Sequence, residues 1–309
     1  MNVVTLPKSL DERYFDPVVK GLDAVGPGER VLFDASHVRW VDPYGLIGLL
    51  AVGTVAKQRG ERPLLKLPDS PEVNSYMARM AFFEHADDIF ELHGHVKRGR
   101  HDGESEVLLE ITAVNEFADI HKVVDLINQR GLRILTTQLH YPLREAYQFS
   151  VIFSEVCQNI VEHAEAGGWV ATQTYNWSKK LGRKVVIIAV MDLGVGFRQS
   201  LSATHAARFP EGWTDLNALE TAFHQGKSRH HDPGRGQGLK QIRKQVDRWD
   251  GRMTIRSGNA RIADVPSWDD TRLTETGLAV LPGSQIGIVL PARVPVLNAA
   301  PVASTVTRR

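Results

Sequence analysis

Apolar positions in the first hundred residues follow two alternating patterns. Residues 31–34 and 63–68 are short apolar runs, which are typical of buried strands. Residues 44–59 repeat leucine and valine at close to helical spacing, and residues 70–83 open with Ser-Pro, a pair typical of an N-cap and first helical position. Strand and helix therefore alternate, which predicts a small α/β domain over residues 1–95.

Beyond this stretch, helical patterns come first and strand patterns gather after them. Strand patterns cover residues 106–114, 169–177, 184–192, 253–257 and 284–291, and helical patterns cover residues 116–130, 142–164 and 238–249. This order favours an α+β sandwich, with helices on one face of a mixed sheet, over residues 104–293. We expect the polar, glycine-rich residues 96–103 to be a linker and residues 294–309 to be a flexible tail.

Composition narrows the class of protein. The 309 residues are 42% hydrophobic and 24% charged, which is ordinary globular usage and excludes wholesale disorder. No apolar run approaches the roughly 20 residues that span a bilayer, and the N-terminus lacks the basic-then-apolar layout of a signal peptide. The single cysteine, Cys157, precludes an internal disulfide and a Cys-rich zinc site. The net charge of +1 gives no reason to expect direct nucleic-acid binding, so we expect a cytoplasmic protein without a membrane span.

Three polar side chains recur every four residues in the helical pattern 142–164. Glu155, Asn159 and His163 shift by about 40° at each step, so they line one stripe of the helix. An amide oxygen can ligate Mg²⁺, and a carboxylate can accept a proton from a nucleophile. The other interpretation is a solvated helix face, with His163 in a packing or capping role. Cys157 lies off this stripe and is expected to be a small buried hydrophobe.

An Asp-x-Gly-x-Gly pattern follows directly after the apolar strand 184–192. Asp192 stands at the end of this strand, where a carboxylate can accept a hydrogen bond from an exocyclic amine. Gly194 and Gly196 would let the backbone approach a flat ligand closely. An ordinary tight turn has the same pattern, so this motif alone does not define a site.

A second glycine cluster precedes the helical pattern 238–249. It reads Gly234-Arg235-Gly236-Gln-Gly238-Leu239. Glycines before a helix N-terminus expose backbone N–H groups, and the helix dipole favours phosphate there. A glycine-rich linker is the other interpretation. Neither glycine cluster spells the G-x-G-x-x-G of a Rossmann site.

In this order, the three motifs resemble the N, G1 and G2 boxes of the GHKL ATPases, a superfamily that includes gyrase B, histidine kinases and anti-sigma-factor serine kinases. The stretches EVCQNIVEHA, VMDLGVGF and GRGQGLKQI are most similar to the anti-sigma kinase branch. The resemblance covers residues 104–293. It implies a Bergerat-type α/β sandwich that binds ATP and Mg²⁺.

The resemblance implies a role for each matching residue. Asn159 would ligate Mg²⁺, Glu155 would act as the general base, and Asp192 would contact the adenine amine. The nucleotide-binding set also takes in both glycine clusters, the lid and the closing strand: Gly194, Gly196, Lys227, Gly234, Arg235, Gly236, Gly238, Leu239 and Ser284.

Residues 197–233 correspond to the ATP lid of this superfamily, a mobile loop that closes over the phosphates. Lys227, Ser228 and Arg235 are the residues that we expect to contact phosphate, and the other interpretation is a solvated basic loop. Because the stretch contains few large apolar residues, it is expected to bury no core of its own and to be locally unstable without ligand.

The first domain resembles a different family. The stretch VLFDASHVRWVDPYGLIGLL, residues 31–50, is similar to the STAS core of anti-sigma-factor antagonists, with matches at Asp34, Ser36, Asp42, Gly45 and Leu46. Pro43 replaces the phosphoacceptor Ser of that pattern, and proline has no hydroxyl. The resemblance implies a STAS-like domain over residues 1–95 that cannot be switched by phosphorylation at this position.

Together the two resemblances predict an ATP-binding regulatory protein in which the STAS-like domain is a docking or sensing module, as in an anti-sigma-type or related bacterial signalling switch. A protein partner is expected, such as a sigma factor, an antagonist or another signalling protein. Two alternatives stay open: a serine/threonine kinase that acts on a separate antagonist, and a non-catalytic nucleotide-binding interaction module. The sequence also leaves open whether the chain forms a homodimer.

Overall fold

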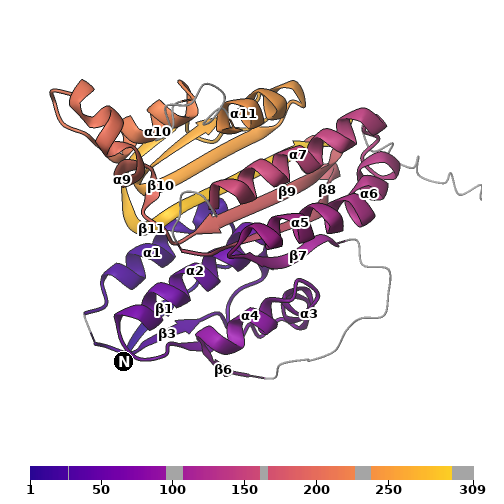
Figure 1. Ribbon diagram of the computed structural model, residues 1–309. Coiled ribbons are helices and arrows are strands. Elements are labelled where there is room, and N and C mark those ends of the chain that lie inside the picture. The colour runs from indigo at the N-terminus through magenta and orange to yellow at the C-terminus, as the bar shows by residue number, and fades with distance from the viewer. Residues whose placement is uncertain (27, 95–106, 161–165, 227–237, 294–309) are drawn as a thin grey trace, which may run out of the picture.

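The computed structural model describes the chain except for residues 27, 95–106, 161–165, 227–237 and 294–309. The described part forms four layers: a parallel sheet, helices that include α1 and α2, an antiparallel sheet, and an outer group of helices (Figure 1). The predicted linker and tail lie outside the described residues. None of the helices in the described ranges is long and apolar enough to cross a membrane.

The first layer is a four-stranded parallel sheet of order β1-β3-β5-β6. Its strands are β1 (Asn2–Thr5), β3 (Val31–Asp34), β5 (Leu64–Lys66) and β6 (Glu91–His93). The helices that connect them are α1 (Asp16–Asp23), α2 (Pro43–Arg59), α3 (Pro71–Arg79) and α4 (Phe82–Ile89). The smaller elements are β2 (Ser9–Leu10), β4 (Trp40–Val41) and the 3₁₀ helix η1 (Glu12–Tyr14). The predicted α/β alternation is confirmed, and β1 is a strand that the sequence reasoning missed.

The second sheet has five strands in the order β10-β11-β9-β8-β7. They are β7 (Val107–Val114), β8 (Gly168–Trp177), β9 (Arg183–Asp192), β10 (Arg252–Asp264) and β11 (Thr274–Pro291). Its larger helices are α5 (Phe117–Leu126), α6 (Leu132–Thr137), α7 (Leu143–Asn159), α9 (Gly196–His205), α10 (Asp215–Phe223) and α11 (Gly238–Arg248). Shorter pieces are the π-helical turn η2 (Ile127–Gly131), α8 (Ser178–Leu181) and η4 (Ala206–Arg208).

All four strand pairs of this second sheet are antiparallel, so the prediction of a mixed sheet is wrong. The helices α5 and α7 run out and back between β7 and β8 (Figure 1). They return the chain to the end of β7, where Gly168 pairs with Val114. A single crossover helix would have made this pair parallel. The combination of a parallel and an antiparallel sheet with helices still agrees with the predicted α/β and α+β classes.

Both faces of the antiparallel sheet are covered. Along β9, Ile188 and Val190 point into the core beneath α7 and α11, whereas Ala189 and Met191 belong to the core of the N-terminal part. Helix α1 contacts β11, and α2 contacts β8 and β9 (Figure 1). The two predicted domains therefore share the core on one face of this sheet, and the core on the other face belongs to the second domain alone.

Helix α2 is buried on nearly every side, and its exposed positions are confined to the last turn. Two of its glycines make this burial possible. A Cβ at Gly48 would come within 2.5 Å of the ring of Phe15, and a Cβ at Gly53 would come within 2.0 Å of the ring of Phe90. A helix that is apolar all round is expected to be enclosed, and α2 lies between the two sheets.

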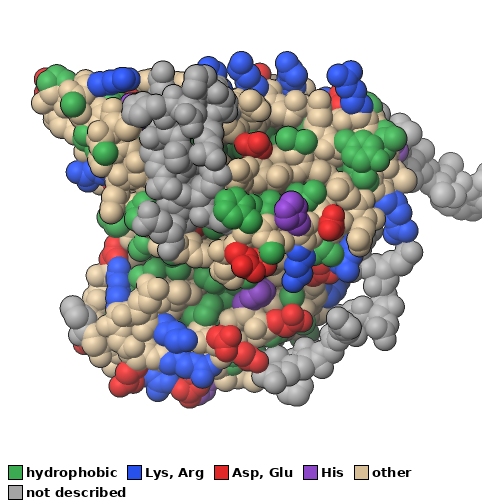
Figure 2. All heavy atoms as spheres, in the orientation of Figure 1, with side chains coloured by type: hydrophobic (Ala, Val, Ile, Leu, Met, Phe, Trp, Pro, Cys, Tyr) green, Lys and Arg blue, Asp and Glu red, His purple; other side chains and the backbone are tan. Residues whose placement is uncertain are grey.

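Helix α11 is amphipathic and forms part of the outer layer. Leu239, Ile242 and Val246 are buried against the sheet, whereas Lys244 and Arg248 are exposed. Lys and Arg side chains line the upper edge of the molecule, where this helix lies (Figure 2). The apolar stripe fixes the rotation of α11 and thereby the direction in which its first residue, Gly238, faces.

The face of β10 that points toward α1 carries buried cations. Arg252 and Arg256 are 6% and 4% exposed. Arg252 donates to Glu12 at 2.8 Å and to Asp269 at 3.3 Å, and Arg256 donates to Asp16 at 3.0 Å. We call these five residues the ionic row. Because Glu12 and Asp16 come from the N-terminal part, the row ties the two halves of the chain together.

Residues 197–226 of the predicted lid are folded. Helices α9 and α10 carry Leu201, Leu219 and Phe223 into the core that they share with α7 and α11. The stretch thus has no separate core of its own, as predicted, but its large apolar residues gather on one side of two short helices and join the core of the rest of the chain. Residues 227–233, the rest of the predicted lid, lie outside the described part of the chain.

The first testable prediction concerns the ionic row. Arg252→Met removes the closest cation of Glu12, whose carboxylate keeps Arg261 at 3.9 Å, and one cation of Asp269, which keeps Arg13 at 3.2 Å. Because the buried Glu12 carboxylate is left poorly matched, the free energy of unfolding should fall by about 3 kcal/mol in chemical denaturation. The control is Arg130→Met, which removes an ion pair with Glu110 that is partly exposed to solvent and should cost at most about 1 kcal/mol. Equal losses in the two variants would contradict a structural role for the row.

The second prediction concerns Asp42, which caps α2 by accepting the N–H of Gly45 at 2.9 Å. Burial raises the pKa of Asp42 from 3.8 to about 8, and the carboxylates of Asp11 and Glu12 act in the same direction. The folded state therefore keeps a proton that the unfolded state loses, and this contribution to stability declines as pH rises from about 4 to about 8.

Asp42→Asn should remove this part of the pH dependence, because Asn stays neutral and still caps a helix. The measurement is the free energy of unfolding in urea at several pH values across the same window. As a control, the slope of the unfolding free energy against urea concentration should be the same in both proteins, which shows that they expose the same surface on unfolding. Parallel pH profiles for the parent and the variant would be the contrary result.

Candidate nucleotide site

The end of α7 lies over the end of β9. Glu155 and Asn159 stand in the last two turns of α7, and Ile160 is its C-cap. A Cβ at Gly168 would lie 3.1 Å from the Ile160 side chain and 3.2 Å from Cα of Asp192. The fold therefore brings the N-box candidates to the strand end that carries the G1 candidate.

Glu155 lies against the start of α11. A Cβ at Gly238 would come within 2.5 Å of Glu155 Oε2. Leu239, the next residue, is buried in the core that includes Val156 of α7. The candidate N-box helix and the described end of the G2 cluster are thus neighbours, and a larger residue at position 238 would displace the carboxylate.

Asp192 is almost completely buried, at 6% exposure, and both of its carboxylate oxygens are hydrogen bonded. Oδ1 accepts the N–H of Gly194 at 2.8 Å, and Oδ2 accepts the hydroxyl of Ser284. Burial raises the pKa of Asp192, and the hydrogen bonds from Ser284 and Gly194 oppose this shift. Since a carboxylate offers about four lone-pair sites, it keeps the capacity to accept a bond from an exocyclic amine.

Two glycines let the backbone close around this carboxylate. Gly283 has φ +74°, and a Cβ there would lie 2.2 Å from the carbonyl oxygen of Asp192. Gly196 has φ +69°, and a Cβ there would lie 2.7 Å from Ser257 Oγ. Both residues occupy the left-handed region of backbone conformation, which favours glycine. The close packing around them and their backbone conformation therefore both require glycine.

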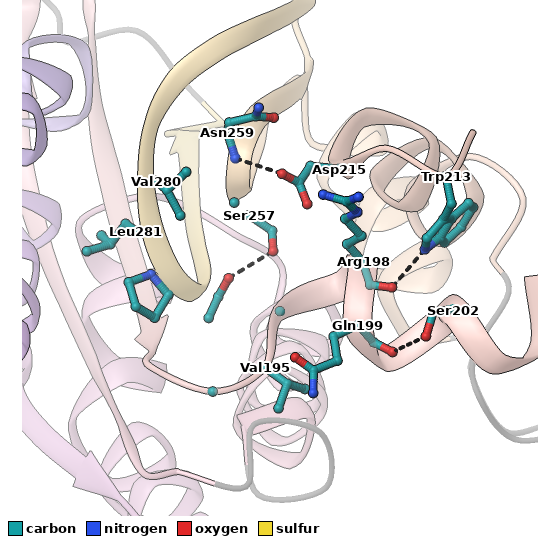
Figure 3. Close-up of a pocket in the computed structure, with 15 residues that line it drawn as sticks. Val195, Arg198, Gln199, Ser202, Trp213, Asp215, Ser257, Asn259, Val280 and Leu281 are labelled. Atoms are coloured by element: carbon teal, nitrogen blue, oxygen red, sulfur yellow. Dashed lines mark hydrogen bonds between the residues drawn. The ribbon is translucent and has the colours of Figure 1, made fainter. Parts of the chain in front are cut away.

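A pocket of about 810 Å³ opens beside this loop (Figure 3). Residues 194–196, 257–259 and 280–283 line it, together with residues from α9, α10 and the turn between them: Arg198, Gln199, Ser202, Trp213 and Asp215. The Trp213 indole donates to the carbonyl of Arg198 at 2.8 Å, and Asp215 accepts the N–H of Asn259 at 3.1 Å. Its lining includes neither Asp192 nor any residue of α7, so this pocket adjoins the candidate site without coinciding with it.

A metal ion at this site would have few protein ligands. Within the described ranges, no group of three or more His, Cys, Asp or Glu side chains could hold a metal. Asn159 is partly buried, and its amide nitrogen has no hydrogen-bond partner among the described residues. Mg²⁺ usually keeps several waters and takes one or two protein oxygens together with substrate phosphates. The Asn159 amide oxygen and nucleotide phosphates would be a sufficient set of donors.

The remaining predicted residues divide into two groups. The residues that lie outside the described part of the chain are Lys227, Ser228, Gly234, Arg235 and Gly236, together with His163. Cys157 is described and is fully buried, and burial raises the pKa of its thiol to about 12. This agrees with the expectation of a small buried hydrophobe.

The residues that match the STAS pattern are buried or half-buried. Pro43 is the first residue of α2 and is buried, and the next residue, Tyr44, is 3% exposed. Asp34 accepts the N–H and the hydroxyl of Ser36, at 3.0 and 2.6 Å. Position 43 is therefore covered by the rest of the chain, in addition to lacking a hydroxyl.

The sequence reasoning missed Ser257 and gave Gly283 no role in the site. The Pro-Gly pair that ends at Gly283, just before the closing strand, is a turn signal that could have pointed to it. The local sequence does not mark Ser257, because its hydrogen-bond partners, Phe197 and Gly283, are 60 and 26 residues away along the chain.

Comparisons with models of protein families, with curated proteins and with solved structures found no match to this chain. The GHKL and STAS resemblances therefore stay predictions, which rest on the motifs and on the geometry described above.

Proposed function

We propose that this protein is a Mg·ATP-binding regulatory protein of the GHKL type, with its STAS-like part docked in cis on the ATP-binding part. The observation that carries the proposal is the meeting of four separate chain segments. Asp192 at the end of β9 pairs with Ser284 of β11, while the end of α7 lies beside them and Glu155 contacts the start of α11. These are two separate contacts, one at Asp192 and one at Glu155, and α7 carries residues that take part in or lie beside both of them.

The residues present fit an adenine nucleotide. Asp192 retains lone pairs for the adenine amine, and the absence of side chains at Gly283 and Gly196 lets the backbone pack closely around this carboxylate. Asn159 has an unpaired amide nitrogen among the described residues, which is costly in a partly buried position. A bound nucleotide with its metal would supply phosphate oxygens and a cation for this amide.

Glu155 supports a catalytic version of the proposal. Its carboxylate lies beside Gly238, the first residue of α11, where a helix N-terminus favours phosphate. A carboxylate in that position could accept the proton of a water molecule or of a substrate hydroxyl. The first acceptor would make the protein an ATPase and the second a serine/threonine kinase that acts on a separate antagonist.

The docked STAS-like part would act as a scaffold or sensor. Pro43 offers no hydroxyl and is buried, so phosphate cannot be transferred to that position within the chain. A protein partner, such as a sigma factor, an antagonist or another signalling protein, would instead read the nucleotide state on the outer surface. In this version the N-terminal part stays docked whether or not nucleotide is bound.

The proposal is tested by titrating the pure protein with ATP in the presence of Mg²⁺ in a calorimeter, followed by incubation with γ-labelled ATP. Binding with release of free phosphate indicates an ATPase, and label on an added antagonist protein indicates a kinase. Binding without either product indicates a non-catalytic nucleotide-binding module. Absence of binding at millimolar nucleotide would refute the proposal.

The third prediction is that Asp192→Asn weakens ATP binding at least tenfold. The variant keeps the size of the side chain but can turn an amide N–H toward the adenine amine, with a loss of about 1.5–3 kcal/mol. The measurement is the calorimetric dissociation constant. The control is Asp264→Asn, a carboxylate that pairs with Arg243 at 2.8 Å away from the candidate site. Equal affinities of Asp192→Asn and the parent would contradict the G1 assignment.

The fourth prediction is that Asn159→Ala weakens ATP binding mainly when Mg²⁺ is present. The physical reason is that the amide oxygen would act as an inner ligand of the metal. Titrations with Mg²⁺ and with a chelator in its place give the comparison, and the chelated sample is the internal control. The same loss in both conditions would assign Asn159 to packing instead.

A further inference from the structure

Ser257 is the last residue of β10 before an irregularity in its pairing with β11. It lies opposite Ser284 in this pairing. The side chain is 2% exposed, so bulk water does not reach it. Met253 and Ile255 of the same strand point into the core beneath the outer helices, and Ser257 continues this face.

The Ser257 hydroxyl joins two loops. Oγ accepts the N–H of Phe197 at 3.1 Å, and the same hydroxyl donates to the carbonyl of Gly283 at 2.8 Å. Phe197 follows Gly196, the last glycine of the candidate G1 box, and Gly283 directly precedes Ser284. One hydroxyl therefore uses its donor and its acceptor on the two segments that flank Asp192.

The glycines bring both loops against this hydroxyl. A Cβ at Gly196 would lie 2.7 Å from Ser257 Oγ and 3.1 Å from the carbonyl oxygen of Gly283. A Cβ at Gly283 would meet Asp192 instead, within 2.4 Å of its Oδ1. Ser257, Gly196, Gly283 and Asp192 thus form one contiguous packed unit around the carboxylate.

We propose that Ser257 is a positioning residue of the candidate adenine site, which holds the G1 loop and the Gly283–Ser284 turn in the relative position that pairs Ser284 with Asp192. Ser257 contacts both segments through directional hydrogen bonds. The hydroxyl, and not the volume of the side chain, therefore holds the two segments in position. This role deepens the proposed function and rests on it.

The test compares Ser257→Ala with the parent. Without the hydroxyl, the Phe197 N–H and the Gly283 carbonyl lose their shared partner in a buried place. We expect the dissociation constant for Mg·ATP to rise about tenfold, the preference for ATP over GTP to narrow, and the amide of Phe197 to exchange its hydrogen faster. The exchange rate is a readout that does not depend on any nucleotide.

The matched control is Thr254→Val, which removes another buried hydroxyl from β10. Thr254 is 1% exposed and donates to the carbonyl of Gly287 at 3.3 Å, away from both loops. This variant should leave ATP affinity and Phe197 exchange unchanged. Ser257→Thr and Ser257→Val form a second pair of nearly equal size that differ in the hydroxyl, and the Thr variant should bind ATP about tenfold more tightly than the Val variant.

The outcomes separate this inference from the proposed function. A parent protein that binds ATP while Ser257→Ala binds it equally tightly, or while the Thr and Val variants match, overturns the positioning role alone. An unchanged hydrogen-exchange rate of the Phe197 amide in Ser257→Ala contradicts the hydrogen-bonded link between the two segments. A parent protein that binds no adenine nucleotide overturns the proposed function and the positioning role together.

Discussion

The enclosure of α2 between two sheets is the constraint on which the rest of this structure depends. A helix that is apolar around most of its circumference cannot be left at a surface, so each side of it needs a covering sheet. The parallel sheet packs on one side and the antiparallel sheet on the other, and glycines of α2 allow the rings of Phe15 and Phe90 to approach closely. The N-terminal part is therefore a structural layer of the whole molecule and not an appended module.

The face of β10 that meets α1 carries buried charges that packing alone does not require. A sheet face that receives helices from another part of the chain could be wholly apolar, yet Arg252 and Arg256 lie there, paired with Glu12 and Asp16. Buried ion pairs add little net stability, but an unmatched buried charge is costly, so the row disfavours any other docking position of α1. We infer that the row contributes to the choice of register between the two halves more than to their affinity.

The same region adjoins the candidate nucleotide site. Asp16 accepts the N–H of Ala279 at 3.2 Å, and Ser257 holds the carbonyl of Gly283 a few residues later on β11. The segment 279–283 is thus held at one end by the N-terminal part and at the other by the loop around Asp192. Docking of the N-terminal part and the geometry of the proposed adenine site are physically connected through this short segment.

The sequence by itself determined the local elements and the identity of the candidate residues. Apolar periodicity located β3, α2, α7 and β9, and the motif spacing selected Asp192 and Asn159, because such signals depend on neighbours along the chain. Tertiary structure alone decided that α1 and α2 cover the antiparallel sheet, that Arg252 and Arg256 of β10 face carboxylates instead of water, and that Ser257 meets Phe197 and Gly283. These contacts join residues from 26 to about 240 positions apart, so no local pattern records them.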